Sequence, residues 1–130
     1  MDFVSFIDRR PPAGEAMISV AERQLKSKLP SEYIEFLSAS DGGECFVGDA
    51  YVNLWGVEEL ATMNAAYEVR KYVPGLLIFG SDGGGEAFGF DTRNSNWPIV
   101  KIPFVGMDWS LARPVGDSFK AFLEALNSVS

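Results

Sequence analysis

The order of its hydrophobic patterns is the feature that most constrains the fold of this chain. Apolar residues recur at helical spacing before residue 42, follow strand-like patterns over most of residues 44–104, and return to helical spacing after residue 117. Helices that flank a run of strands favour an α+β fold, because a doubly wound parallel sheet needs a helix between successive strands. We expect one domain over residues 1–130, with a twisted antiparallel sheet covered by N-terminal and C-terminal helices.

The N-terminal third carries three helical signals. Apolar residues at the start of the chain share a helical spacing, so a short helical cap on the core is predicted there. Ser19 with Glu22 three residues later has the form of a capping box, which predicts a helix beginning at Ser19. Pro30 precedes a second predicted helix, which Gly42-Gly43 ends. The residues that carry the first signal are Phe3, Phe6 and Ile7.

Strand patterns fill the middle of the chain. A continuous apolar run at 76–79 indicates a strand buried on both faces. Pro98 and Pro103 place the last strand at a sheet edge or limit its pairing at both ends. A third helix is predicted over 57–69, and Asp117 or Ser118 caps a final one. The predicted strands cover residues 44–47, 51–55, 76–79, 86–90 and 99–104.

The chain lacks the side chains on which many catalytic and metal sites depend. It contains no histidine and one cysteine, Cys45, whose neighbours read as a strand. Catalytic arrangements that use histidine, histidine-ligated zinc, iron–sulfur clusters and internal disulfides therefore cannot be assembled from it. We expect no catalytic residues, no cofactor and no metal.

Two loops suggest ligand sites only superficially. Gly83 to Gly85 could indicate a phosphate cradle, but no Lys-Ser/Thr follows, and the neighbouring Asp82 and Glu86 would repel a phosphate. The loop that begins at Asp91 starts like a calcium loop, yet its third position is arginine and its twelfth isoleucine. Tight turns explain both loops.

Acidic pairs could also serve a hydrolase, if they converged in one pocket.

Charge separates the classes of partner. Lys and Arg number 11 against 18 Asp and Glu, which gives a net charge of −7. Such a field repels phosphate backbones and anionic lipids and attracts basic proteins, although acidity also confers solubility by itself. We expect a basic protein partner, no nucleic acid, no membrane, and a monomer or weak homodimer.

The single cysteine and the lack of a signal-peptide pattern predict a cytoplasmic location.

Ordered motifs through most of the chain resemble the SUKH superfamily, the Smi/Knr-type domain. No single motif is specific, but their order and separation are. The matching residues are Ile18, Ala21-Glu22, Leu25, Leu29-Pro30, Tyr33, Phe36-Leu37, Asp41-Gly42-Gly43, Leu54-Trp55, Leu60, Asn64, Tyr67, Phe79 to Glu86, Phe88, Asp91, Ser118-Phe119 and Phe122-Leu123.

The resemblance implies an immunity protein that binds and neutralises a cognate polymorphic toxin, without catalysis. The acidic charge favours a basic toxin, such as a nuclease. A regulatory scaffold of the Smi/Knr type is the alternative that the resemblance leaves open. Because most motif residues suit turns and core positions, recognition is predicted on exposed loops. The candidate partner-binding residues are Asp41, Glu44, Asp82, Glu86 and Asp91, with Trp55 as an aromatic anchor.

Overall fold

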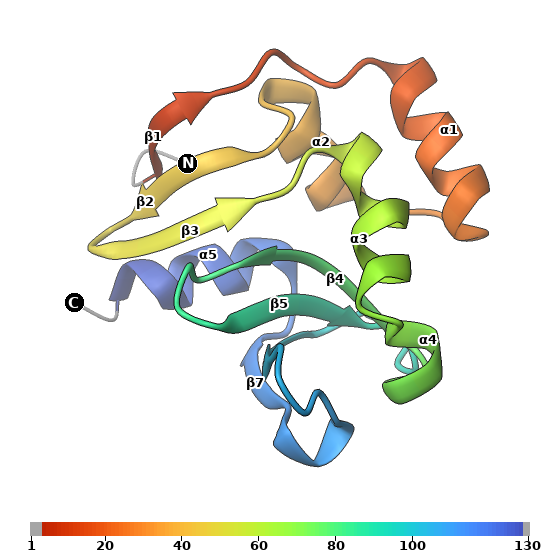
Figure 1. Ribbon diagram of the computed structural model, residues 1–130. Coiled ribbons are helices and arrows are strands. Elements are labelled where there is room, and N and C mark those ends of the chain that lie inside the picture. The colour runs from red at the N-terminus through yellow and green to blue at the C-terminus, as the bar shows by residue number, and fades with distance from the viewer. Residues whose placement is uncertain (1–3, 129–130) are drawn as a thin grey trace.

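A computed structural model describes residues 4–128 of the chain (Figure 1). Seven strands form one sheet in which every neighbouring pair is antiparallel and consecutive in sequence. This arrangement confirms the predicted α+β fold. The strands are β1 (Val4–Arg9), β2 (Gly43–Val47), β3 (Ala50–Leu54), β4 (Leu76–Ser81), β5 (Glu86–Asp91), β6 (Ile99–Pro103) and β7 (Arg113–Gly116).

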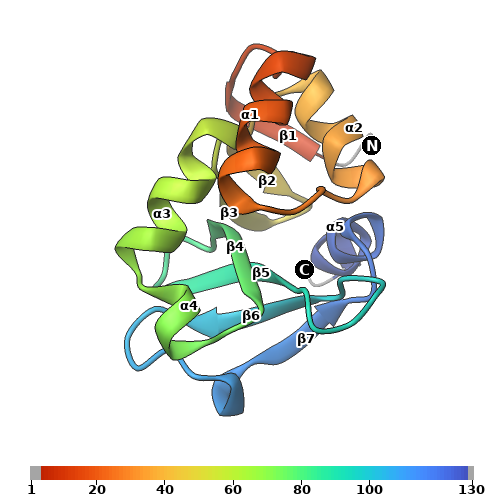
Figure 2. The same cartoon turned by 90° about the vertical axis from the view of Figure 1, so that its right-hand side faces the viewer.

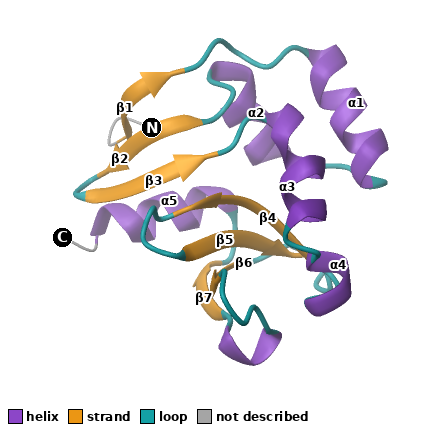
Figure 3. Ribbon diagram, in the orientation of Figure 1, coloured by secondary structure: helices purple, strands orange, loops and turns teal. Residues whose placement is uncertain are grey.

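Helices come from both ends of the chain and from the segment between β3 and β4 (Figure 3). In the part of the chain that the structure describes, none of them is long and apolar enough to cross a membrane. They are α1 (Glu15–Leu25), α2 (Ser31–Ala39), α3 (Leu60–Ala66), α4 (Val69–Tyr72) and α5 (Phe119–Ser128), with the 3-10 turns η1 (Val57–Glu59) and η2 (Trp109–Leu111).

The sheet has two halves that meet at a narrow seam. β3 and β4 pair through only two residue pairs, Asn53 with Ser81 and Leu54 with Gly80. A Cβ on Gly80 would lie 2.7 Å from the Asn53 carbonyl oxygen, so the seam needs glycine at this position. In both Figure 1 and Figure 2, α5 lies between the half formed by β1–β3 and the half formed by β4–β7. One helix therefore supports both halves.

Aromatic rings fill the core between the sheet, α2 and α5. The ring of Phe79 lies 4.7 Å from that of Phe90 and 5.6 Å from those of Tyr33 and Phe122, centroid to centroid. A second, smaller cluster on the other face of the sheet includes Ile78 and packs beside α4. β4 is consequently buried on both faces, as its continuous apolar run predicted.

The N-terminal segment is a strand, so the prediction of a helical cap is wrong. Val4 and Phe6 are half-buried and pack on the core, whereas Ser5 and Ile7 are exposed. This alternation has the period of a strand, and β2 supplies the hydrogen-bonding partner. Phe3, which shared the predicted helical spacing, lies outside the described residues.

The predicted capping box is also wrong. α1 begins at Glu15, four residues before Ser19, and Gly14 is its N-cap. The carboxylate of Glu22 instead accepts a hydrogen bond of 2.8 Å from the backbone amide of Leu29. Glu22 therefore secures the connection between α1 and α2. The start of α2 directly after Pro30 is confirmed.

Three further findings concern the part of the chain that follows β3. The helix predicted over 57–69 is divided into η1, α3 and α4, and Glu68 adopts a left-handed conformation with φ of 52° between the last two. β7 was not predicted from the sequence. Since β6 pairs with both β5 and β7, it is not an edge strand, and the alternative that prolines limit its ends applies.

Tyr33 supplies a test of the core. Its side chain is about 1% exposed, and its hydroxyl has no hydrogen-bond partner among residues 4–128. An unsatisfied buried hydroxyl costs roughly 1–3 kcal/mol. Tyr33→Phe keeps the ring contacts, so we expect it to raise the free energy of unfolding in urea by about 1 kcal/mol. Tyr51→Phe, which removes a partnered hydroxyl, is the control and should bring no gain. A less stable Tyr33→Phe protein would contradict this account.

Candidate functional site

The six predicted partner-binding residues lie in different surroundings. Trp55 and Asp91 are each only 5% exposed. The ring of Trp55 packs in the second core cluster, 6.4 Å from that of Phe104. Its indole therefore stabilises the interior and presents little surface to a partner.

Asp91 closes the turn that follows β5. Arg93 donates to its carboxylate through Nε at 2.9 Å and through a terminal nitrogen at 3.0 Å, and Asn94 donates at 3.1 Å. The guanidinium of Arg93 also stacks on Trp109, with its central carbon 3.5 Å from the ring centroid. These contacts give Asp91 a structural role in holding the turn against η2.

Asp41 and the two glycines after it join α2 to the sheet. Asp41 Oδ1 accepts a 2.7 Å hydrogen bond from the backbone amide of Val57, at the start of η1. Gly42 and Gly43 have φ of +75° and +121°, and a Cβ on Gly42 would lie 2.5 Å from the Leu54 carbonyl oxygen. The close approach of backbone to backbone explains this motif without a ligand.

Asp82 and Glu86 lie together at the β4–β5 turn, but two cations accompany them. Lys101 Nζ lies 3.2 Å from Asp82 and 3.7 Å from Glu86, and a terminal nitrogen of Arg113 lies 2.8 Å from Glu86. Asp82 also accepts from the amides of Gly84 and Glu86 within the turn. This cluster is thus locally neutral, which weakens its attraction for a basic partner.

The carboxylates do not converge as a hydrolase would require. Glu86 and Asp91 stand at opposite ends of β5, and Asp91 is engaged by Arg93. The thiol of Cys45 is buried, and burial raises its pKa to about 11, so the thiolate is scarce at neutral pH. Neither arrangement offers an activated nucleophile or a pair of carboxylates facing one substrate.

Glu44 lies on the face of β1–β3 that points away from α5, and we call this the open face. The side chains on it are exposed or half-buried, whereas those on the opposite face of β2 and β3 are buried, except for the half-buried Ala50. Glu44 accepts a 2.7 Å hydrogen bond from the hydroxyl of Tyr51. The outward residues, from the strand register, are Ser5, Asp8, Glu44, Phe46, Tyr51 and Asn53.

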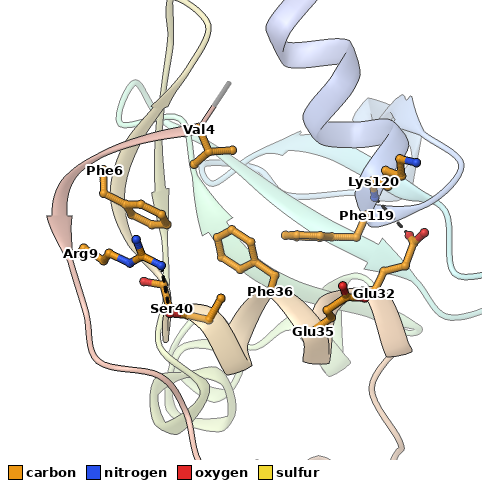
Figure 4. Close-up of a pocket in the computed structure, with 10 residues that line it drawn as sticks. Val4, Phe6, Arg9, Glu32, Glu35, Phe36, Ser40, Phe119 and Lys120 are labelled. Carbon is orange, nitrogen blue, oxygen red and sulfur yellow. Dashed lines mark hydrogen bonds between the residues drawn. The ribbon is translucent and has the colours of Figure 1, made fainter. Parts of the chain in front are cut away.

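A groove on the other side of β1 was not predicted from the sequence (Figure 4). It encloses about 590 Å³, and the rings of Phe6, Phe36 and Phe119 lie along it. Arg9 at its rim donates to the Ala39 carbonyl oxygen at 3.4 Å. These rings come from β1, α2 and α5, and the sequence indicated them only as core residues. Two carboxylates and two cations share the rim, so the groove has no strong charge preference. The rim residues are Arg9, Glu32, Glu35 and Lys120.

Comparison with known families gave one match. The model of the family described as SMI1 / KNR4 family (SUKH-1) matches residues 12–125. The matched range runs from the segment before α1 into α5 and includes every motif on which the resemblance rests. No curated protein matched the chain.

The contacts of Asp91 predict a pH-dependent stability. Hydrogen bonds from Arg93 lower the pKa of Asp91 in the folded protein, so its stabilising effect is present above the unfolded pKa, near 4, and is lost as the pH falls through the folded value. Asp91→Asn should therefore lower the free energy of unfolding at pH 7 by about 1 kcal/mol, a modest figure because solvent screens the half-exposed Arg93.

Urea unfolding at pH 7 and near pH 3 would test this expectation. The difference between the variant and the original protein should shrink at the lower pH. Asp49→Asn, at an exposed position of the β2–β3 turn, is the control and should change little at either pH. A deficit in Asp91→Asn that stays constant with pH would show that the carboxylate charge contributes nothing.

Proposed function

The chain belongs to the SMI1 / KNR4 (SUKH-1) family, and from this premise we propose that it is an immunity protein that binds a protein toxin and neutralises it. Immunity against polymorphic toxins is the role that the resemblance to the SUKH superfamily implies. The proposed mechanism is occlusion: the immunity protein covers the active site of the toxin in the cytoplasm and performs no reaction itself.

The observation that carries the proposal, beyond the family, is the surplus of acidic residues. The net charge of −7 belongs to a chain whose charged pairs at Asp82, Glu86 and Asp91 are already matched by cations. The unmatched charge therefore comes from other carboxylates, including Asp8 and Glu44 on the open face. An acidic field accelerates association with a basic protein and discriminates against acidic ones.

A nuclease fits this charge well as the toxin. Proteins that bind phosphate backbones carry clustered Lys and Arg, and these clusters surround the site where the nucleic acid is cut. An acidic protein that covers such a cluster both blocks the substrate and replaces the phosphates electrostatically. A regulatory scaffold of the Smi/Knr type is the alternative, and a gene with no toxin gene beside it would favour that alternative.

The proposal predicts protection by a direct complex. Co-expression with the product of the adjacent gene should restore growth that this product alone prevents, and the two proteins should elute together from a size-exclusion column. Because steering is electrostatic, raising the salt concentration from about 0.05 to 0.5 M should slow association by roughly tenfold or more.

The control is an unrelated acidic protein of similar size and net charge, which should give neither protection nor co-elution. Growth arrest that persists in the presence of this chain, or a neighbouring product that is harmless, would refute the immunity role.

A further inference from the structure

We infer that the open face of β1–β3 is the surface on which a basic protein partner docks. This inference deepens the proposed function, on which it rests for the class of partner. The occupant is a protein surface that presents a Lys or Arg side chain beside apolar residues.

The open face is an outer sheet surface separated from the core by strand alternation. On β2 and β3 the inward side chains of Cys45, Val47 and Val52 are fully buried, and α2 and α5 pack on this inward side. Phe46, which points outward between Cys45 and Val47, is 41% exposed. An aromatic ring left in water on a sheet surface is a ready source of binding energy when a partner covers it.

The aromatic pair on this face is already held in place. The rings of Phe46 and Tyr51 lie 6.0 Å apart in an edge-to-face arrangement. The Tyr51 hydroxyl is bonded to Glu44, and its ring lies against the β4–β5 turn, where a Cβ on Gly83 would come within 2.7 Å of it. Because Tyr51 is ordered before binding, a partner loses less conformational entropy on contact with it.

The charge of the open face indicates that the partner presents a basic side chain. Asp8 and Glu44 stand directly opposite each other in the β1–β2 register, and like charges in such positions repel. None of the described outward residues of these strands is Lys or Arg. The nearby Arg10 donates its hydrogen bond to Glu59, and it attracts Asp8 only at longer range. A cationic side chain laid across Phe46 would place its stem on the ring and its charge beside the two carboxylates.

The edge of β1 favours docking on the face over addition of a strand. The register shifts between Phe6 and Asp8, which marks an irregularity in β1, and Asp8 and Arg9 put charges on this strand. Bulges and charged residues are devices that discourage pairing of an exposed edge with another chain. A partner is therefore expected to contact side chains of β1–β3 and not to extend the sheet.

Titration of the 15N-labelled full chain with the peptide acetyl-Lys-Leu-Lys-Phe-Lys-amide tests the surface. Chemical-shift changes should concentrate on β1–β3. Asp8→Asn combined with Glu44→Gln should weaken binding by about tenfold, and Phe46→Ala should weaken it by a similar factor. The matched controls, Glu68→Gln with Glu124→Gln and Tyr72→Ala, remove equal charge or an exposed ring elsewhere and should change binding less than about twofold.

Three results with the peptide would overturn the inference: no binding, shift changes centred on other elements, or equal weakening in the test and control variants. The same variants measured against the product of the adjacent gene separate the two proposals. If the toxin binds all variants equally well, the immunity role stands but the open face is not its docking surface. If the peptide binds the open face and no toxin binds the chain, the docking surface stands but the immunity role does not.

Discussion

The ring of Phe79 lies where both ends of the chain meet the middle of the sheet. It contacts Tyr33 from α2, Phe119 and Phe122 from α5, and Phe90 from the neighbouring strand. Through Phe79 these contacts link α2 to α5, and Tyr33 and Phe119 on these helices lie more than eighty residues apart in sequence. Burial of such large rings is the main favourable term in folding, and here it also fixes the position of α5 between the two half-sheets. The seam between β3 and β4 depends on that support.

Family motif residues in this chain mostly serve closure of the fold. Asn64 on α3 is an example, because its amide nitrogen donates to the carbonyls of Leu60 and Ile78 and its oxygen accepts from the Ile78 amide. It thereby attaches α3 to β4. Glu22 likewise joins α1 to α2, through its hydrogen bond from the Leu29 amide. Substitution of residues that hold the elements together would disturb the fold. Recognition of a partner is therefore expected on the open face, whose residues lie at other positions.

Proline and glycine signals predicted their elements correctly, whereas the local pattern of Ser19 and Glu22 misplaced the start of α1. Pro30 and the Gly83 to Gly85 turn located α2 and the β4–β5 hairpin, because φ preferences act within a few residues. β1 was mistaken for a helix because a few apolar residues fit both periods. The charge pairing of Glu86 with Arg113 and the juxtaposition of Asp8 with Glu44 depend on strand register across long separations, which composition and spacing do not specify.

The open face and the buried inward face belong to the same strands, but substitutions on the two faces affect stability differently. Substitution of an exposed side chain that packs on no neighbour usually alters stability little, whereas its inward neighbour is fixed by the core. Along β2, inward residues that the fold requires therefore alternate with outward residues that can vary. Substitutions can therefore accumulate at the outward positions of these strands while the inward residues preserve the fold.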